Sequence, residues 1–103
     1  MIPKGVKPDM LKHMIFTKFE NPEEQAKVAG EKLMALKDKI PQIVSIETGL
    51  DCLHSARSYD LALIVTFNSR KDLEIYDSHP AHAEVRAYIR AHRTATASVD
   101  FEY

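Results

Sequence analysis

The chain has 103 residues, a formal net charge of −1 and a hydrophobic fraction of 45%, which indicates one globular domain of ordinary composition. Its lysines and arginines are scattered, so no basic face predicts nucleic-acid binding, and no apolar run approaches the roughly 20 residues that a membrane span needs. The single cysteine, Cys52, excludes an internal disulfide framework and favours a reducing compartment, so we expect a cytoplasmic protein.

The N-terminal segment, residues 1–9, contains two prolines and a glycine and lacks the apolar core of a signal peptide. We therefore expect a flexible arm there, followed by one domain over residues 10–103.

The first half of that domain predicts a strand, a helix and a second strand. Residues 11–19 alternate, with His13 and Ile15 on one face and Met14 and Phe16 on the other. Asn21 is suited to cap a helix that begins at Pro22, and Pro41 ends it. Its apolar stripe recurs at spacings of three and four, at Ala26, Ala29, Leu33, Leu36 and Ile40. Residues 43–50 predict the second, shorter strand, and a polar loop follows.

The second half has the same order. Residues 59–67 give the strongest strand signal, with apolar side chains on both faces. Ser69 is suited to cap a second helix, which is interrupted at His79 and resumes from Pro80 with His79 as its new cap. Residues 94–103 alternate between polar and apolar and predict a fourth strand.

This β-α-β-β-α-β order predicts a ferredoxin-like α+β fold, in which a four-stranded antiparallel sheet has both helices on one face. Helices cover only one side of such a sheet, yet three of its strands carry apolar residues on both sides. An uncovered apolar face needs a partner, so we predict a homodimer through that face. The residues on the uncovered face are expected among Met14, Phe16, Ala62, Ile64, Ala97 and Val99.

Three stretches together resemble the stress-responsive α/β-barrel (Dabb) family: MLKHMIFTKF, SYDLALIVTFNSRKDLEIYDSHPAH and VDFEY. The resemblance covers residues 10–103 and implies a dimeric ferredoxin-like barrel. A cofactor-free plant polyketide cyclase of the family has a catalytic histidine and tyrosine that match His82 and Tyr76, and a pocket histidine that matches His13. Another pocket histidine of that cyclase falls at Leu61 here. Thr96, Ser98 and Arg93 replace less polar residues, which implies a more polar pocket.

The residues around Pro80 suit acid–base chemistry. His82 is expected in the first turn of the resumed helix, where the dipole disfavours a positive imidazole and keeps the neutral base. Tyr76 is then placed to hydrogen-bond an enolising carbonyl, so the pair suits proton removal followed by intramolecular ring closure. The alternatives are that His82 is a polar packing residue and that Tyr76 is part of the core.

A cavity between helices and sheet is the expected binding site, lined by His13, Ile15, Leu61, Leu63 and Val85. His13 has the alternative of being a buried histidine satisfied by a backbone carbonyl. His79 and His82 lack a third ligand for a metal, and no phosphate-binding glycine loop occurs, so we expect neither metal nor cofactor. A non-catalytic stress protein and a monooxygenase are the competing functions.

Overall fold

A computed structural model of the chain describes residues 9–103, so the arm expected at residues 1–9 lies almost wholly outside the described part. The elements, in chain order, are strand β1 (Leu11–Phe19), helix α1 (Pro22–Met34), the 3₁₀ helix η1 (Ala35–Asp38), strands β2 (Ser45–Leu50) and β3 (Leu61–Phe67), helices α2 (Arg70–Ser78) and α3 (Pro80–His92), and strand β4 (Arg93–Glu102). None of the helices in this part is long and apolar enough to cross a membrane.

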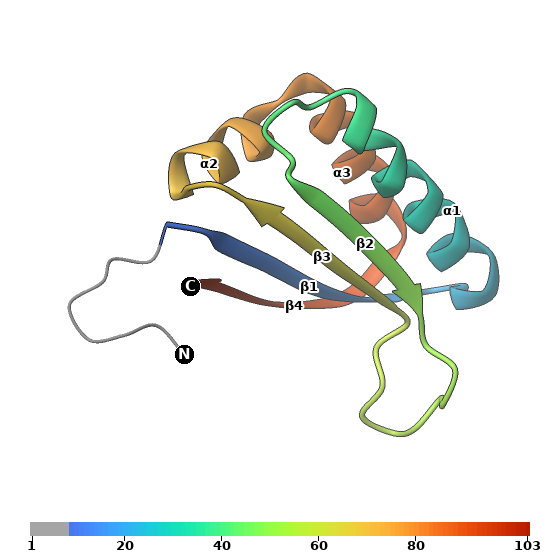
Figure 1. The fold of residues 1–103 in the computed structure, drawn as a ribbon. Coiled ribbons are helices and arrows are strands. Elements are labelled where there is room, and N and C mark those ends of the chain that lie inside the picture. The colour runs from blue at the N-terminus through green and yellow to red at the C-terminus, as the bar shows by residue number, and fades with distance from the viewer. Residues whose placement is uncertain (1–8) are drawn as a thin grey trace.

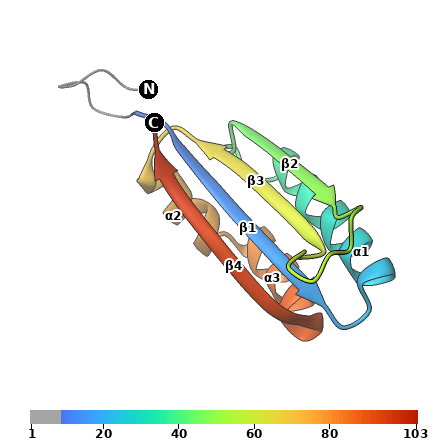
Figure 2. The same cartoon turned by 90° about the horizontal axis from the view of Figure 1, so that it is seen from below.

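The four strands form one antiparallel sheet in the order β2-β3-β1-β4. Figure 1 shows the three helices α1, α2 and α3 together on one face of it, and Figure 2 shows the opposite face with no helix over it. The ferredoxin-like architecture predicted from the sequence is therefore confirmed.

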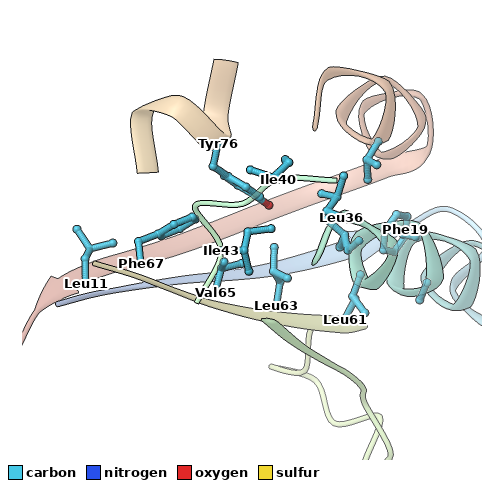
Figure 3. Packing of buried hydrophobic residues seen from close by; sticks show 14 residues of the cluster. Leu11, Phe19, Leu36, Ile40, Ile43, Leu61, Leu63, Val65, Phe67 and Tyr76 are labelled. Carbon is cyan, nitrogen blue, oxygen red and sulfur yellow. The ribbon is translucent and has the colours of Figure 1, made fainter. Parts of the chain in front are cut away.

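Alternation along each strand sorts the side chains between the two faces. Ile15 pairs with Leu63 on the helix side, and Phe16 pairs with Ala62 on the other. The core lies between the helices and the sheet (Figure 3) and includes Leu36, Ile40, Val65, Phe67 and Tyr76, each almost completely buried.

Several boundaries differ from the sequence prediction. Strand β4 begins and ends one residue earlier than predicted, at Arg93 and Glu102. Helix α1 ends at Met34, earlier than its apolar stripe up to Ile40 predicts, and the chain continues through the 3₁₀ helix η1. Strands β2 and β3 each begin two residues later than predicted, although the ladder frays gradually: the Val44 amide still donates to the Thr66 carbonyl at 2.9 Å, and the Asp60 amide to that of Thr17 at 2.9 Å.

The predicted cap at Asn21 is wrong, whereas those at Ser69 and His79 are confirmed. The Asn21 side chain makes no capping hydrogen bond. Gln25 reaches back instead, its Oε1 accepting from the Asn21 amide at 2.9 Å. Ser69 Oγ accepts from the Asp72 amide at 3.1 Å, as its position before α2 predicts.

Candidate functional site

The break between α2 and α3 brings two aromatic side chains together. A residue before proline avoids the helical region, and His79 is accordingly extended, with φ −68° and ψ 137°. Its Nδ1 accepts from the Ala81 amide at 3.0 Å and caps α3. Tyr76 in the last turn of α2 and His82 in the first turn of α3 then lie with ring centroids 4.4 Å apart.

The imidazole of His82 is nearly enclosed, with its side chain 13% exposed. Its Nδ1 lies 3.1 Å from the Asp77 carbonyl oxygen and 2.8 Å from Nη2 of Arg86. Burial lowers the pKa of His82 below its usual range, and the Arg86 charge acts in the same direction, while the hydrogen bond with Asp77 partly opposes them. The ring is therefore neutral near pH 7.

Asp77 and Arg86 both contact Nδ1 of this imidazole. Arg86 Nη2 donates to the Asp77 carbonyl oxygen and, at 3.2 Å, to its Oδ1. Neither residue was identified from the sequence. The signal was present, because Arg86 lies four residues after His82 and so shares its face of α3.

Tyr76 is completely buried, and its hydroxyl has no hydrogen-bond partner in the described part of the chain. Burial, helped by the negative charge of Asp77, raises the pKa of Tyr76 above its ordinary value, so the hydroxyl stays protonated. Figure 3 shows the ring reaching over the sheet with its oxygen directed inward, toward the region of Ile40 and Leu36. An orphan buried hydroxyl of this kind costs stability, so it calls for an explanation.

His13 on β1 completes the cluster from the sheet side. Its ring centroid lies 6.1 Å from that of Tyr76, nearly edge-on. Its Nδ1 forms a short contact with Oδ1 of Asp100, which is its direct partner across β1 and β4. Asp100 was missed from the sequence, because only the strand register places it opposite His13.

A pocket of about 160 Å³ opens between α3 and the sheet, next to this cluster. It is lined by all five residues predicted to bind substrate and by His82: His13, Ile15, Leu61, Leu63, Val85 and His82. Tyr76 does not line it, so the pocket reaches one member of the predicted pair and stops short of the other. Its lining also includes four charged residues, Asp77, Arg86, Arg90 and Arg93.

Two larger hollows, of about 570 and 440 Å³, lie around the loop between β2 and β3. The first is lined by Asp51, His54 and Asp60, and the second by Phe16, Arg57 and Tyr59. His54 is exposed, and Asp60 is engaged by the Phe19 amide at 2.8 Å. By volume alone these hollows would be the better candidate sites. They lack a buried base, so we take the smaller pocket, which contains His82, as the candidate functional site.

Metal binding finds no support in residues 9–103, where no three histidine, cysteine, aspartate or glutamate side chains gather. His79 uses its Nδ1 to cap α3, and Cys52 lies exposed in the β2–β3 loop. His92 lies against Tyr88, and its Nδ1 is 3.2 Å from Nε2 of Gln25.

Residues 11–103 match the model of the stress-responsive A/B barrel domain, Dabb. No curated protein sequence matches the chain. Among solved structures, a dimeric ferredoxin-like protein of unknown function from Bacteroides fragilis is 29% identical, with a TM-score of 0.80, over 92% of this chain and 97% of that one. A second dimeric one, from Thermobifida fusca, is 20% identical, with a TM-score of 0.81, over 98% and 97% of the two chains. The hydroxynitrile lyase of Passiflora edulis is 16% identical, with a TM-score of 0.81, over 94% and 95%.

Proposed function

This chain belongs to the stress-responsive A/B barrel (Dabb) family, and we propose that its pocket performs cofactor-free acid–base chemistry, of a cyclase or lyase type, on a small carbonyl compound. The observation that carries the proposal is a neutral, nearly enclosed imidazole, His82, that lines a pocket and is held in place through its Nδ1. The shared fold of a hydroxynitrile lyase is compatible with this chemistry but, at 16% identity, supports the fold alone.

The proposed reaction requires one tautomer of His82, with the hydrogen on Nδ1 and a free lone pair on Nε2. Nη2 of Arg86 has two hydrogens, and Asp77 offers two oxygens for them, its carbonyl and its Oδ1. Nδ1 of His82 lies near both a donor, Nη2 of Arg86 at 2.8 Å, and an acceptor, the Asp77 carbonyl oxygen at 3.1 Å. In the tautomer that the proposed reaction requires, Nδ1 donates its hydrogen to that carbonyl, with the hydrogens of Arg86 Nη2 directed to Asp77. Nε2 then keeps its lone pair and is the basic atom, the usual consequence of an Nδ1–H bound to a backbone carbonyl.

The proposed reaction begins when Nε2 of His82 takes a proton from the carbon next to a carbonyl. The electron pair of the broken C–H bond moves toward that carbonyl and leaves an enolate. In a cyclase, the enolate carbon attacks a second carbonyl of the same molecule, and protonated His82 returns its proton to the new alkoxide. In a lyase, the base takes a hydroxyl proton instead, and the neighbouring C–C bond breaks as the carbonyl forms. The electron pair of that bond leaves with the departing carbon, which takes the proton from protonated His82.

Tyr76 is proposed to donate its hydroxyl hydrogen to the carbonyl oxygen on which charge develops. Its burial keeps the hydroxyl protonated, and its lack of a partner leaves that hydrogen bond available. Because the pocket stops short of Tyr76, substrate must part the side chains over it. His13, held by Asp100, is proposed to bind substrate from the sheet side.

Deuterium exchange tests the first step without knowledge of the natural substrate. We expect the protein to speed deuterium incorporation between the carbonyls of small 1,3-diketones in D₂O, as followed by NMR. His82→Asn should remove the acceleration, whereas His54→Asn, the same change at an exposed histidine, should preserve it. Asparagine is used at this position because His54 has a positive φ of 53°, which asparagine adopts more readily than most residues.

Equal acceleration by wild type and His82→Asn would rule out His82 as the base. No acceleration by wild type, with His82→Asn and Tyr76→Phe altering only thermal stability, would favour the non-catalytic role. The buried, closed-in Tyr76 is the observation that favours that alternative.

The functional unit is proposed to be a homodimer that buries the uncovered face of the sheet. Met14, Phe16 and Ile64 lie on that face by register, and Val99 is 56% exposed there. An apolar sheet face of this kind is a liability in a monomer. The structures from Bacteroides fragilis and Thermobifida fusca are described as dimeric, which supports a second copy as the cover.

A further inference from the structure

A row of one neutral histidine and three arginines runs along α3 into the start of β4, beside the pocket. His82, Arg86 and Arg90 follow one another at spacings of four, so their side chains lie along the same side of the helix. Arg93 follows the helix in an extended conformation and begins β4. All four residues line the pocket. The base therefore lies at one end of the row, and the arginines extend away from it.

The charges of this row are only partly balanced. Arg86 pairs with Asp77 at 3.2 Å. Asp77 is the only acid among the lining residues, and the nearby Asp100 is engaged by His13. Within residues 9–103, Arg90 and Arg93 form no ion pair. Two guanidinium groups without an ion-pair partner in residues 9–103 thus line a pocket in which His82 is neutral.

Basic residues in a last helical turn have an ordinary explanation, since they complement the negative end of the helix dipole. That explanation does not require the side chains to line a cavity. Side chains on a helix lean toward its N-terminus, so Arg90 leans back along α3 toward His82, while Arg93, at the start of β4, lines the same pocket. Their placement therefore provides two guanidinium groups in the pocket lining that can donate hydrogen bonds to a carboxylate.

The lining and the volume of the pocket limit the polarity and the size of the molecule that carries the carboxylate. Leu61 and Leu63 from the sheet and Leu33 and Ile89 from the helices give the pocket an apolar part, and His13, Thr17 and Thr96 add polar groups on the sheet side. A volume of about 160 Å³ compares with the 150 Å³ cavity that holds one benzene molecule. One ring, or a chain of similar bulk, fills it, and a long alkyl tail does not fit.

We infer that the substrate of this pocket is a carboxylate-bearing carbonyl compound of about one ring in size, with its carboxylate on Arg90 and Arg93 and its carbonyl end at His82. This inference rests on the proposed function for the identity of the reacting end. The α-carbons of His82 and Arg90 are about 12 Å apart along the helix axis, a span that the long arginine side chain shortens. The two groups of the substrate therefore lie at opposite ends of its body.

Matched ligands test the carboxylate requirement by calorimetry on the full chain. The probes are 4-acetylbenzoate and its neutral isostere 4-acetylbenzamide, which share one ring and one enolisable ketone. We expect wild type to bind the carboxylate roughly tenfold more tightly, with the preference falling as salt rises from 50 to 500 mM. Arg90→Gln/Arg93→Gln should abolish the preference, and Arg90→Lys/Arg93→Lys should keep part of it.

The control is Lys27→Gln/Lys37→Gln, which removes the same charge from exposed positions on α1 and η1 and should keep the full preference. Equal affinity of wild type for both probes, no binding of 4-acetylbenzoate at millimolar concentration, or a preference that survives in Arg90→Gln/Arg93→Gln would each overturn the inference.

His82→Asn separates this inference from the proposed function. It should keep the preference for the carboxylate while losing deuterium exchange. A wild type that discriminates between the probes but accelerates no exchange would refute the acid–base function and leave the carboxylate site standing. Acceleration of exchange with no discrimination would do the reverse.

Discussion

The two faces of the sheet solve the problem of apolar surface in different ways. On the helix side the chain covers itself, and Val65, Phe67 and Tyr76 are completely buried there. On the other side nothing in the described chain covers the sheet, and Val99 and Phe101 stay 56% and 41% exposed. The covered face also accommodates a neutral histidine, an orphan hydroxyl and a small pocket. The comparison teaches that the core and the proposed chemistry share one face, while the proposed association uses the other.

The largest effect is expected from a cavity in the covered face. Phe67→Ala removes a completely buried ring that packs 5.1 Å from Tyr76, centroid to centroid. We expect a loss of about 3–5 kcal/mol in the free energy of unfolding, as for other buried aromatic truncations. Urea denaturation measures it. A loss below about 1 kcal/mol would mean that this face is not the folding core.

A charge on the uncovered face should affect association first. Val99→Asp places a carboxylate within the proposed dimer interface, so we expect a shift from dimer to monomer in light scattering after size exclusion. Met34→Asp is the matched control, because Met34 is also apolar and 43% exposed but lies on α1. A Val99→Asp protein that remains as dimeric as wild type would exclude this face as the interface.

Removal of the orphan hydroxyl should act in the opposite direction on stability. Tyr76→Phe keeps the ring against His82 and deletes a buried polar atom that has no partner. We expect stability to rise by about 1 kcal/mol, within the usual cost of an unsatisfied buried group. Thermal unfolding measures the change. A clear loss of stability would show that the hydroxyl has a partner in solution.

The smallest effect is expected from pH. The pKa of His82 is lowered in the folded protein, mainly by burial, so the unfolded chain binds the proton more readily. The resulting stability is fully present above the unfolded pKa of about 6.5 and is lost as pH falls through the lower folded value. Urea titrations of wild type and His82→Asn between pH 7.5 and 5 should therefore show a shallower fall in the variant. Parallel curves would contradict the neutral, buried state.

Local patterns predicted most of the fold. The alternation in β1 and β3 placed the side chains on the correct faces, and the His79–Pro80 pair marked the helix break, because these signals act over a few residues. The end of α1 at Met34 was not predictable, since the apolar stripe continues unchanged into η1.

The candidate site was predictable only in part. The residues that line the pocket followed from strand faces and from the family resemblance. The pairing of His13 with Asp100 depends on the register between β1 and β4, which joins residues far apart in the chain. The sealing of Tyr76 depends on how its neighbours pack, which no spacing reveals.

The break at His79 also sets the angle between the directions of the Tyr76 and His82 side chains. In an unbroken helix, residues six apart differ by about 600°, so Tyr76 and His82 would point about 120° away from each other. One extended residue replaces that rotation and leaves their rings 4.4 Å apart. The proximity of the two side chains is therefore set by a single peptide unit, and a chain that kept both residues but continued the helix through positions 79 and 80 would contain the pair without the site.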